Sequence, residues 1–223
     1  EVKNVCKNGK RVLITAGRTE ELIDPVRYIS NRSSGKTATA IASVFYEAGF
    51  DVTMVCGPMD VAAPGFSKVV NVRSAIEMHE AVLSQAKDYD VLVHCAAVAD
   101  YRPAEVANEK IKDSRSQLHL DLIPNPNILR DSVAQKRKGQ VVVGFALETE
   151  KPELHAKEKL EKSGADLLVL NMPVAKESGF GKDNVAFSLV EKGGTVPELQ
   201  MASKRDLALG ILRFTLLELE KTK

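Results

Sequence analysis

Three small residues, Ser33, Ser34 and Gly35, stand directly before a segment with helical periodicity. Small residues at such a place leave backbone N–H groups open to an anion, and the dipole of the following helix adds positive potential. The connection that contains them, ITAGRTEELIDPVRYISNRSSGK at residues 14–36, is long for a compact domain, and long connections are commonly functional. The pattern indicates a phosphate cradle, although a helix cap and turn would use the same residue types.

A second polar stretch, HCAAVADYRPAEVANEKIK at residues 94–112, begins at the end of another apolar run. Ala96 and Ala97 would let a planar ligand approach the backbone, and Asp100 can hold a magnesium ion that lies on phosphates. Close packing of the alanines and a turn at Asp100 are the structural alternatives. Lys110 is a candidate only because a phosphate site is predicted, since a lysine in a polar loop is usually a solvated charge.

Two shorter segments contain candidates for contact with a nucleotide. In IPNPNIL, residues 123–129, Asn125 is predicted to cap a helix whose first residue is Pro126. In VVVGFALET, residues 141–149, Phe145 lies at the end of a buried strand, where an aromatic ring can stack on a base or pack in the core. The four histidines show no spacing typical of a metal site, so we expect them to be structural or surface residues.

A sheet has to position these residues. Five runs rich in Val, Ile and Leu predict buried parallel strands at residues 11–16, 51–56, 90–95, 140–145 and 166–171. The stretches between them predict amphipathic helices, the second one capped by Ser74, at residues 37–48, 76–87, 128–135 and 153–162. The alternation predicts an α/β fold: a doubly wound parallel sheet with helices on both faces, which binds ligands beyond the carboxyl ends of its strands.

The last part of the sequence has a different pattern. Residues 184–190 and 196–200 predict a hairpin that turns at Lys192, Gly193 and Gly194, and a closing helix is predicted from about Lys204. The hairpin has too few apolar residues for a separate core, and no linker rich in Pro, Gly or Ser precedes it. We therefore expect residues 1–223 to form a single domain with a C-terminal hairpin appendage.

Composition excludes several classes of protein. The 223 residues carry 31 Lys and Arg against 30 Asp and Glu, so a net charge of +1 gives no global field for nucleic acid or an anionic membrane. No apolar run approaches the roughly 18 residues of a transmembrane helix, and no leader opens the chain, so we expect a cytoplasmic protein. Three widely spaced cysteines, Cys6, Cys56 and Cys95, are expected to be reduced. Because the chain begins with Glu1 rather than Met, we expect it to be part of a longer protein.

Two other nucleotide-binding patterns are missing from the sequence. A Walker A loop that ended near Gly35 would need glycine at position 30, where the chain has Ser30. A dinucleotide fingerprint needs three glycines after the first strand, but Gly17 stands alone, and Gly57 and Pro58 follow the second strand in place of an acidic ribose ligand. These departures disfavour a nicotinamide-dependent reductase, and a non-catalytic nucleotide-binding module is the other alternative.

Five segments, in the order in which they occur, resemble the phosphopantothenoylcysteine synthetases, the ligase half of a bacterial bifunctional coenzyme A enzyme. They are ITAG with DPVRYISNRSSGK, CAAVADYRP with EKIK, NPNIL, VVGFALET, and KEKLEKSGADLLVLN. The resemblance implies a Rossmann-like homodimer in which CTP, with Mg²⁺, converts 4′-phosphopantothenate into an acyl-cytidylate and pyrophosphate, and the amine of L-cysteine then displaces CMP. In this family a flavin-dependent decarboxylase often precedes the synthetase, but no part of it lies in this residue range, so we expect no FMN.

The resemblance also implies roles for individual residues. Lys110 would neutralise phosphate and Asn31 would hold the acyl-cytidylate for the second step, which makes these two the expected catalytic residues. Arg27, Asn31 and Ala97 are expected to bind 4′-phosphopantothenate, and Asp100 to meet the triphosphate and its magnesium ion. The residues expected to bind the nucleotide are Gly17, Ser34, Gly35, Ala96, Asp100, Lys110, Pro126, Asn127, Ile128, Leu129, Phe145, Lys159 and Ser163.

The sequence departs from the family pattern at several positions within these segments, among them Thr37 and Ala38, which replace the usual Met-Gly. Arg18 stands where the family usually has proline, and Ser163 where it has a basic residue, with Lys162 beside it. Asn127 replaces an aspartate and so exchanges an acceptor-only group for one that also donates, which we expect to alter recognition of the base or ribose. CTP rather than ATP as the co-substrate is therefore an expectation taken from the family alone.

Overall fold

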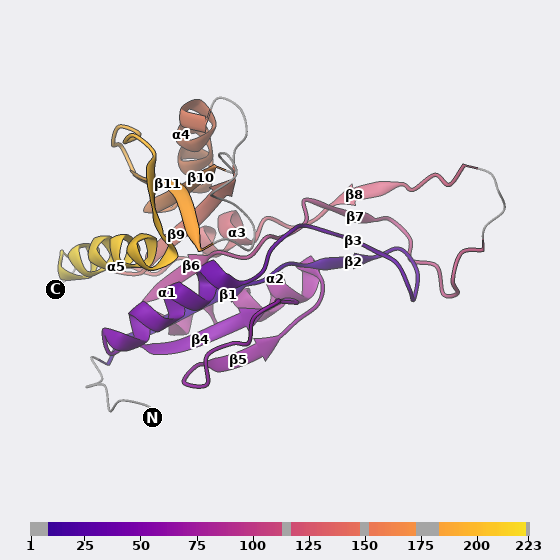
Figure 1. The fold of residues 1–223 in the computed structure, drawn as a ribbon, viewed down its shortest axis with the longest axis horizontal. Helices are drawn as coiled ribbons and strands as arrows, with labels where there is room; N and C mark the ends of the chain where they lie inside the picture. Colours follow the sequence, from indigo (N-terminus) through magenta and orange to yellow (C-terminus); the bar gives the residue numbers. More distant parts are fainter. Residues whose placement is uncertain (1–8, 113–116, 148–151, 173–182, 222–223) are drawn as a thin grey trace.

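The computed structural model describes residues 9–112, 117–147, 152–172 and 183–221, and an eight-stranded sheet forms its centre (Figure 1). In spatial order the strands are β12 (Gln200–Ser203), β11 (Asn184–Glu191), β10 (Leu167–Met172), β9 (Val141–Leu147), β6 (Val91–His94), β1 (Arg11–Ala16), β4 (Asp51–Cys56) and β5 (Lys68–Asn71). From β10 to β5 neighbouring strands are parallel, whereas β11 and β12 pair antiparallel at one edge. The predicted mostly parallel, Rossmann-like sheet is confirmed.

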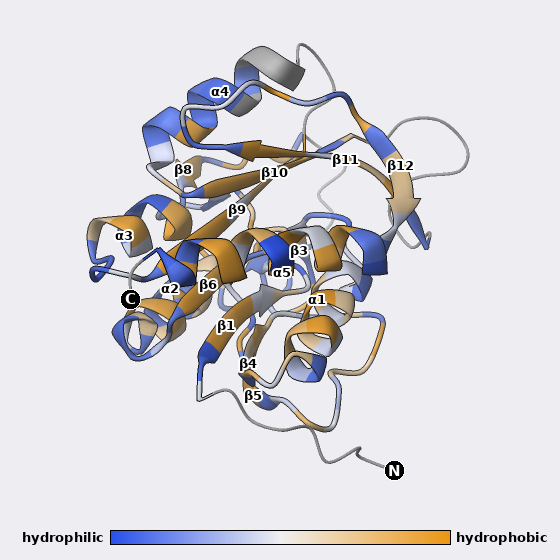
Figure 2. Ribbon diagram, turned by 90° about the vertical axis from the view of Figure 1, so that its left-hand side faces the viewer, coloured by the Kyte–Doolittle hydropathy of each residue, from blue (hydrophilic) through white to orange (hydrophobic). Residues whose placement is uncertain are grey.

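Helices cover both faces of this sheet. They are α1 (Lys36–Glu47), α2 (Ala75–Leu83), α3 (Ile128–Ala134), α4 (Pro152–Ser163) and α5 (Lys204–Glu220), with a short 3₁₀ helix at Ala86–Asp88. Successive residues of β1 point to opposite faces: Val12 and Ile14 share a core with α1 and α5, and Leu13 shares one with α2, α3 and α4. Burial on both faces explains why the strands are continuous apolar runs (Figure 2). Among the described helices, none is long and apolar enough to cross a membrane.

The predicted elements of the sheet and its helices lie close to their predicted bounds. All five predicted strands are confirmed, with ends that differ by at most two residues. Ser74 caps α2 as predicted, because its Oγ accepts a hydrogen bond from the Glu77 N–H at 3.2 Å. The second predicted helix was too long: α2 ends at Leu83, and the chain tightens into the 3₁₀ helix Ala86–Asp88 before β6.

The start of α3 corrects another expectation. Asn127, not Asn125, is the cap, since its Oδ1 accepts a hydrogen bond from the Arg130 N–H at 3.0 Å. Asn125 instead donates from Nδ2 to the carbonyl oxygen of Ala99 at 2.8 Å, which ties it to the loop after β6. Pro126 therefore precedes the helix rather than opening it.

The predicted C-terminal hairpin forms, but its second strand was placed four residues too early. β12 spans Gln200–Ser203 rather than residues 196–200, because Ser203 pairs with Asn184 and Gln200 with Phe187, so the connection between the strands is longer than the predicted turn. The hairpin extends the main sheet through β11, which pairs with β10. α5 follows directly and begins with a capping box between Ser203 and Asp206.

Four short strands that the sequence did not predict form an arm that projects from the sheet (Figure 1). They pair as two antiparallel ribbons, β2 (Glu20–Leu22) with β3 (Tyr28–Ser30) and β7 (Tyr101–Pro103) with β8 (Leu122–Pro124). The N–H of Ala107 donates to the carbonyl oxygen of Ile23 at 3.0 Å and so joins the chain after β7 to the first ribbon. The two polar stretches that the sequence singled out thus lie side by side.

Asp24 is a hub of hydrogen bonds in the arm. Its side chain is fully buried and accepts hydrogen bonds from the N–H groups of Val26 and Ile111 and from the guanidinium of Arg27. Burial opposes ionisation of this carboxyl, but the donors outweigh it and hold the pKa of Asp24 below its usual range. The charged carboxylate therefore links the two ribbons of the arm.

Candidate functional site

Two adjoining cavities open beyond the carboxyl ends of β1, β6 and β9. The first has a volume of about 550 Å³ and the second about 610 Å³. They share lining residues from the loop after β6, from β9 and from α4, namely Ala96, Val98, Asp100, Phe145 and Lys159. We call them the first and second lobes of one cleft, which lies where a sheet of this type binds its ligands.

The predicted phosphate cradle, Ser33 to Gly35, lines the first lobe at the start of α1. Gly35 is the N-terminal flanking residue of α1 and has a φ of 81°, and no side chain among the described residues caps this helix. A Cβ at position 35 would lie 2.5 Å from Sδ of Met59. Glycine is therefore required here by both conformation and space, and the first residues of α1, Lys36 to Ala38, line the lobe.

A neighbouring loop holds the cradle in place. Arg18 donates from Nη1 to the carbonyl oxygen of Ser33 and to Oδ1 of Asp60, both at 2.8 Å. The N–H of Asp60 in turn donates to the carbonyl oxygen of Ser34 at 3.1 Å. Gly17, with a φ of 77°, lets this approach occur, because a Cβ there would lie 2.6 Å from the carbonyl oxygen of Pro58. The sequence identified Arg18 only as a departure from the family.

The loop after β6 brings Asn31 and Ala97 to the first lobe. The N–H of Ala97 donates to the carbonyl oxygen of Gly17 at 2.8 Å, and Asn31 donates from Nδ2 to the carbonyl oxygen of Val98 at 3.0 Å. The N–H of Ala96 is held by Oγ1 of Thr15 at 3.1 Å. These bonds fix the Asn31 amide beside the backbone over which a planar ligand would lie.

The second lobe lies between α3 and α4. Its lining includes the predicted nucleotide-binding residues Pro126, Asn127, Ile128, Leu129 and Ser163. Leu129 packs directly over β9, where a Cβ on Gly144 would lie 2.6 Å from Leu129 Cδ2. The absence of a side chain at Gly144 therefore lets α3 approach the sheet and sets the depth of the lobe.

His94, at the end of β6, also lines the second lobe, although the sequence gave no functional signal for it. Its Nε2 lies 2.9 Å from Oγ of Ser132. Burial lowers the pKa of His94 to about 4, so the ring is uncharged at neutral pH. An uncharged ring can accept or donate a hydrogen bond here without adding to the charge of the cleft.

The cleft carries excess positive charge. Among its described lining residues the first lobe has one carboxylate, Asp100, against four basic side chains: Arg32, Lys36, Lys159 and Lys204. The family resemblance predicted Lys159 in the site. Arg32, Lys36 and Lys204 were not predicted, because a lysine or arginine next to a helix start is usually a solvated surface charge. With a net charge of +1 for the whole chain, this local excess is what an anionic ligand would meet.

The lining of the cleft suits magnesium that is bound mainly through its substrate. No group of three or more His, Cys, Asp and Glu side chains in the described ranges could hold a metal ion. Asp100 is the carboxylate that the two lobes share. One carboxylate together with substrate phosphates is a common environment for Mg²⁺.

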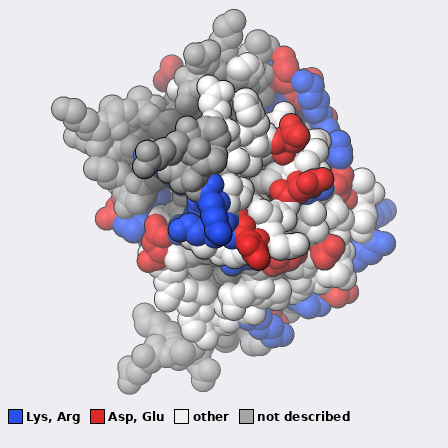
Figure 3. Space-filling model, turned by 90° about the vertical axis from the view of Figure 1, so that its right-hand side faces the viewer, with Lys and Arg blue, Asp and Glu red and all other residues white. Residues whose placement is uncertain are grey.

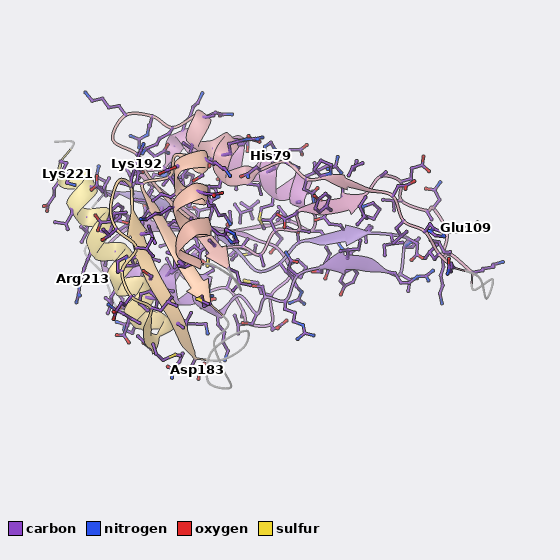
Figure 4. All side chains as sticks on the ribbon, turned by 90° about the horizontal axis from the view of Figure 1, so that it is seen from above. His79, Glu109, Asp183, Lys192, Arg213 and Lys221 are labelled. Atoms are coloured by element: carbon purple, nitrogen blue, oxygen red, sulfur yellow. The ribbon has the colours of Figure 1, made fainter. Side chains whose placement is uncertain are left out.

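Two expected site residues, Arg27 and Lys110, lie outside both lobes, in the arm. Arg27 donates from Nη2 to Asp24 and to the carbonyl oxygen of Ile111, so it organises the arm. Lys110 is exposed and follows Glu109, which Figure 4 labels at the far end of the arm. Figure 3 views the molecule from that end and shows a compact group of Lys and Arg side chains. One chain alone does not bring these residues to the cleft.

Comparison with known proteins supplies the context for this cleft. Residues 7–217 match the family described as the DNA/pantothenate metabolism flavoprotein C-terminal domain. The coenzyme A biosynthesis bifunctional protein CoaBC of Vibrio vulnificus is 42% identical over 206 residues, which are 92% of this chain and 51% of that protein. This chain thus spans about half the length of the curated relatives that it matches.

Solved structures share the fold. A crystal structure of the C-terminal domain of a CoaBC protein is 38% identical, with a TM-score of 0.80, and the match covers 96% of this chain and 98% of that one. A structure described as the Cab2 mutant H337A in complex with phosphopantothenate-cysteine has a TM-score of 0.75 at 19% identity, covering 95% of this chain and 87% of that one. The second likeness shows the common fold alone.

Proposed function

The chain belongs to the DNA/pantothenate metabolism flavoprotein C-terminal domain family, and on that premise we propose that it is a phosphopantothenate–cysteine ligase of coenzyme A biosynthesis. CTP activates 4′-phosphopantothenate as an acyl-cytidylate, and L-cysteine then forms the amide. The observation that carries this proposal is the meeting of twelve expected nucleotide-binding residues, all except Lys110, in one positively charged cleft.

The chemistry of the first step needs positioning more than a protein nucleophile. A carboxylate oxygen of 4′-phosphopantothenate attacks the α-phosphorus of CTP, and the bond to the bridging oxygen breaks as pyrophosphate leaves. Negative charge gathers on the phosphates, so fixed N–H groups of the cradle and the ammonium of Lys159 would stabilise the transition state. Mg²⁺ on Asp100 and the phosphates would neutralise further charge when bound.

In the second step the amine of L-cysteine attacks the acyl carbonyl carbon and the bond to CMP breaks. The Asn31 amide, held on the carbonyl oxygen of Val98, would keep the acyl-cytidylate in place for this attack. Replacing Asn31 with Ala should leave pyrophosphate release in the first turnover nearly intact and lower amide formation. Equal amide formation by the variant would contradict this role.

Association of two copies through the arm is part of the proposal. Exposed apolar side chains are concentrated on the arm, among them Val26, Tyr28, Tyr101 and Val106, with exposures of 59%, 44%, 56% and 51%. Such a group of side chains is typical of a surface that a partner covers. A dimer would carry Arg27 and Lys110 of one protomer to the cleft of the other, where they would bind phosphate and 4′-phosphopantothenate.

The nucleotide preference is also proposed. Asn127 uses its Oδ1 to cap α3, so its Nδ2 is the group that we propose meets the nucleotide. An aspartate could cap the helix equally well but could not donate. A donor there suits the carbonyl oxygen or ring nitrogen of cytosine.

The longer protein and its location complete the proposal. The relatives named bifunctional are about twice as long as this chain, and we propose that it works with a flavin-dependent decarboxylase that holds FMN outside this residue range. We place it in the cytoplasm, since the free thiols of Cys56 and Cys95 suit a reducing compartment.

The experiment that tests the function measures pyrophosphate release with 4′-phosphopantothenate and Mg²⁺, comparing CTP with ATP and with and without cysteine. Release with CTP that becomes catalytic when cysteine is added is expected. Release with ATP instead would keep the ligase and overturn the nucleotide assignment to Asn127. Nucleotide binding without release would favour a non-catalytic binding module.

A further inference from the structure

Two lysines at the starts of two helices line the first lobe: Lys36 directly follows the cradle, whereas Lys204 lies far along the chain from every segment that resembles the family. Lys204 begins α5 and is only 9% exposed, and Lys36 begins α1. Asp183 links the two starts, because Lys36 Nζ lies 3.0 Å from its Oδ1 and the Lys204 N–H donates to its carbonyl oxygen at 3.1 Å. The first turn of α5 is already capped by Ser203, so Lys204 contributes its side chain to the lobe.

The position of Lys204 is costly for a cation. Burial lowers the pKa of its ammonium group, the charge of Lys36 lowers it further, and Asp183 and Cys95 oppose both effects. Asp183 is 90% exposed, so its carboxylate is well solvated. A buried lysine beside a second lysine is stabilised when an anion occupies the space between them.

The division of the cleft indicates which anion this is. Phe145 and Lys159 line both lobes, the α3 residues line only the second lobe, and Lys36 and Lys204 line only the first. A nucleoside in the second lobe therefore directs its phosphates past Lys159 toward the two lysines. The β- and γ-phosphates, which are the farthest from the nucleoside, would therefore lie beside Lys36 and Lys204.

We propose that Lys204, together with Lys36, binds the terminal phosphates of the nucleoside triphosphate and holds pyrophosphate as it leaves. This inference rests on the proposed function. When the α-phosphorus is attacked, the bridging oxygen takes the electron pair of the breaking bond, and the two ammonium groups stabilise the negative charge that develops on the departing pyrophosphate. Lys204 is then a group that discriminates a triphosphate from a monophosphate.

The test compares the binding of CTP, CMP, pyrophosphate and 4′-phosphopantothenate by calorimetry, with Mg²⁺ present. Lys204→Met keeps the apolar stem and removes the charge, and Lys36→Met does the same at a partly exposed position. Each variant should bind CTP and pyrophosphate at least about tenfold more weakly, with CMP changed less than about twofold. Lys204→Arg should restore part of the loss.

Arg205→Met is the matched control. It removes one positive charge from the adjacent residue, whose guanidinium pairs with Glu47 and lines neither lobe. It should bind all four ligands as the unaltered chain does. An unaltered chain that binds neither CTP nor CMP would overturn the proposed function together with this inference.

Other outcomes would overturn the inference alone. They are equal binding of CTP by both lysine variants and the unaltered chain, an equal loss for CTP and CMP, and a loss confined to 4′-phosphopantothenate. The last result would assign the lysines to the phosphate of the other substrate.

Discussion

Arg18 and Asp60 are joined across the base of the cradle, with Arg18 Nη1 2.8 Å from Asp60 Oδ1 and at the same distance from the carbonyl oxygen of Ser33. The carbonyl oxygens of Ser33 and Ser34 therefore both accept hydrogen bonds, from the Arg18 side chain and from the Asp60 N–H respectively. The arrangement holds Ser33 and Ser34 at the start of α1, where both line the first lobe. The pair thus positions the cradle without itself lining the cleft.

The first prediction concerns this pair. Arg18→Gln should raise the KM for the nucleotide about tenfold and change kcat less than threefold, because the cradle loosens while the reacting groups stay in place. Arg18→Lys should recover part of the loss. The midpoint of thermal unfolding should fall by only a few degrees, since a partly exposed ion pair contributes roughly 1 kcal/mol or less. Arg213→Gln, on the exposed face of α5, is the control; an equal rise in its KM would count against the prediction.

Gly35 provides the second prediction. In Gly35→Ala the new Cβ would lie 2.5 Å from Met59 Sδ and the residue would keep a φ near 81°, which costs about 1 kcal/mol in an L-amino acid. Nucleotide affinity should fall at least about tenfold, as measured by calorimetry. Met59→Ala added to Gly35→Ala should recover the part due to the clash and not the part due to φ. Gly65→Ala, with open space around it, should change nothing; if it weakened binding as much, local geometry would not explain the effect.

The third prediction is a pH dependence of stability that His94 contributes. Its pKa of about 4 in the folded chain lies below the ordinary value of 6.5. As the pH falls from about 6.5 toward 4, the unfolded chain gains a proton that the folded chain does not bind, so the free energy of unfolding decreases, by about 3 kcal/mol at most. The decrease, followed by urea unfolding, should shrink in His94→Gln. His119→Gln, at an exposed position, is the matched control; an identical pH profile for His94→Gln would refute the assignment.

The fourth prediction tests the hub of the arm. Asp24→Asn removes a buried charge that three sets of donors surround, so the N–H groups of Val26 and Ile111 should lose their strong acceptor. Hydrogen exchange of peptides covering residues 20–30 and 103–112 should quicken at least about tenfold, with the sheet unchanged. Asp121→Asn, exposed on the same arm, serves for comparison. Unaltered exchange in Asp24→Asn would show that the carboxylate does not hold the ribbons together.

The fifth prediction tests whether the arm completes a neighbouring cleft. Lys110→Ala and Asn31→Ala should each lose amide formation when alone, but an equal mixture, after exchange of subunits, should regain about a quarter of the original activity. Half of the dimers in the mixture carry both variants, and one of their two clefts then has intact copies of both residues. An activity that stays at the level of the separate variants would place Lys110 and Asn31 in the same protomer's site.

The five predicted strands could be recognised because they are largely buried on both faces. The parallel edge strand β5, whose residues are mostly exposed, gave no such apolar run and was missed. Val12, Leu13 and Ile14 fill two cores at once, and such a strand cannot be mistaken for a polar loop. The residues at the carboxyl ends of these strands were then predictable too, since the fold gathers them at one edge. The polar motifs of the sequence and the strand order of the sheet therefore indicate the same edge as the site.

The arm could not be predicted from the same reasoning. Its strands have three residues each and carry exposed apolar side chains such as Tyr28 and Tyr101, so they give no alternation of apolar and polar positions. Asp24 stabilises the arm by accepting a hydrogen bond from the N–H of Ile111, which lies far along the chain. Long-range hydrogen bonds of this type leave no local pattern.

Lys204 was missed for a related reason. A lysine at the start of a helix reads as a surface charge, and only the antiparallel return of β11 and β12 brings it to Asp183 and α1. The confusion of Asn125 with Asn127 had a local cause: both can cap, and the bond from Asn125 to Ala99 decides between them.

The packing of α5 beside α1 makes the order of synthesis matter. Ile41 and Phe45 of α1 share a core with Leu207 and Ile211 of α5, which the ribosome adds much later. The same helix, α5, supplies Lys204 to the lobe that Ser33 to Gly35 line. Until α5 leaves the ribosome, a nascent chain therefore lacks both the packing partner of α1 and the Lys204 side of the lobe.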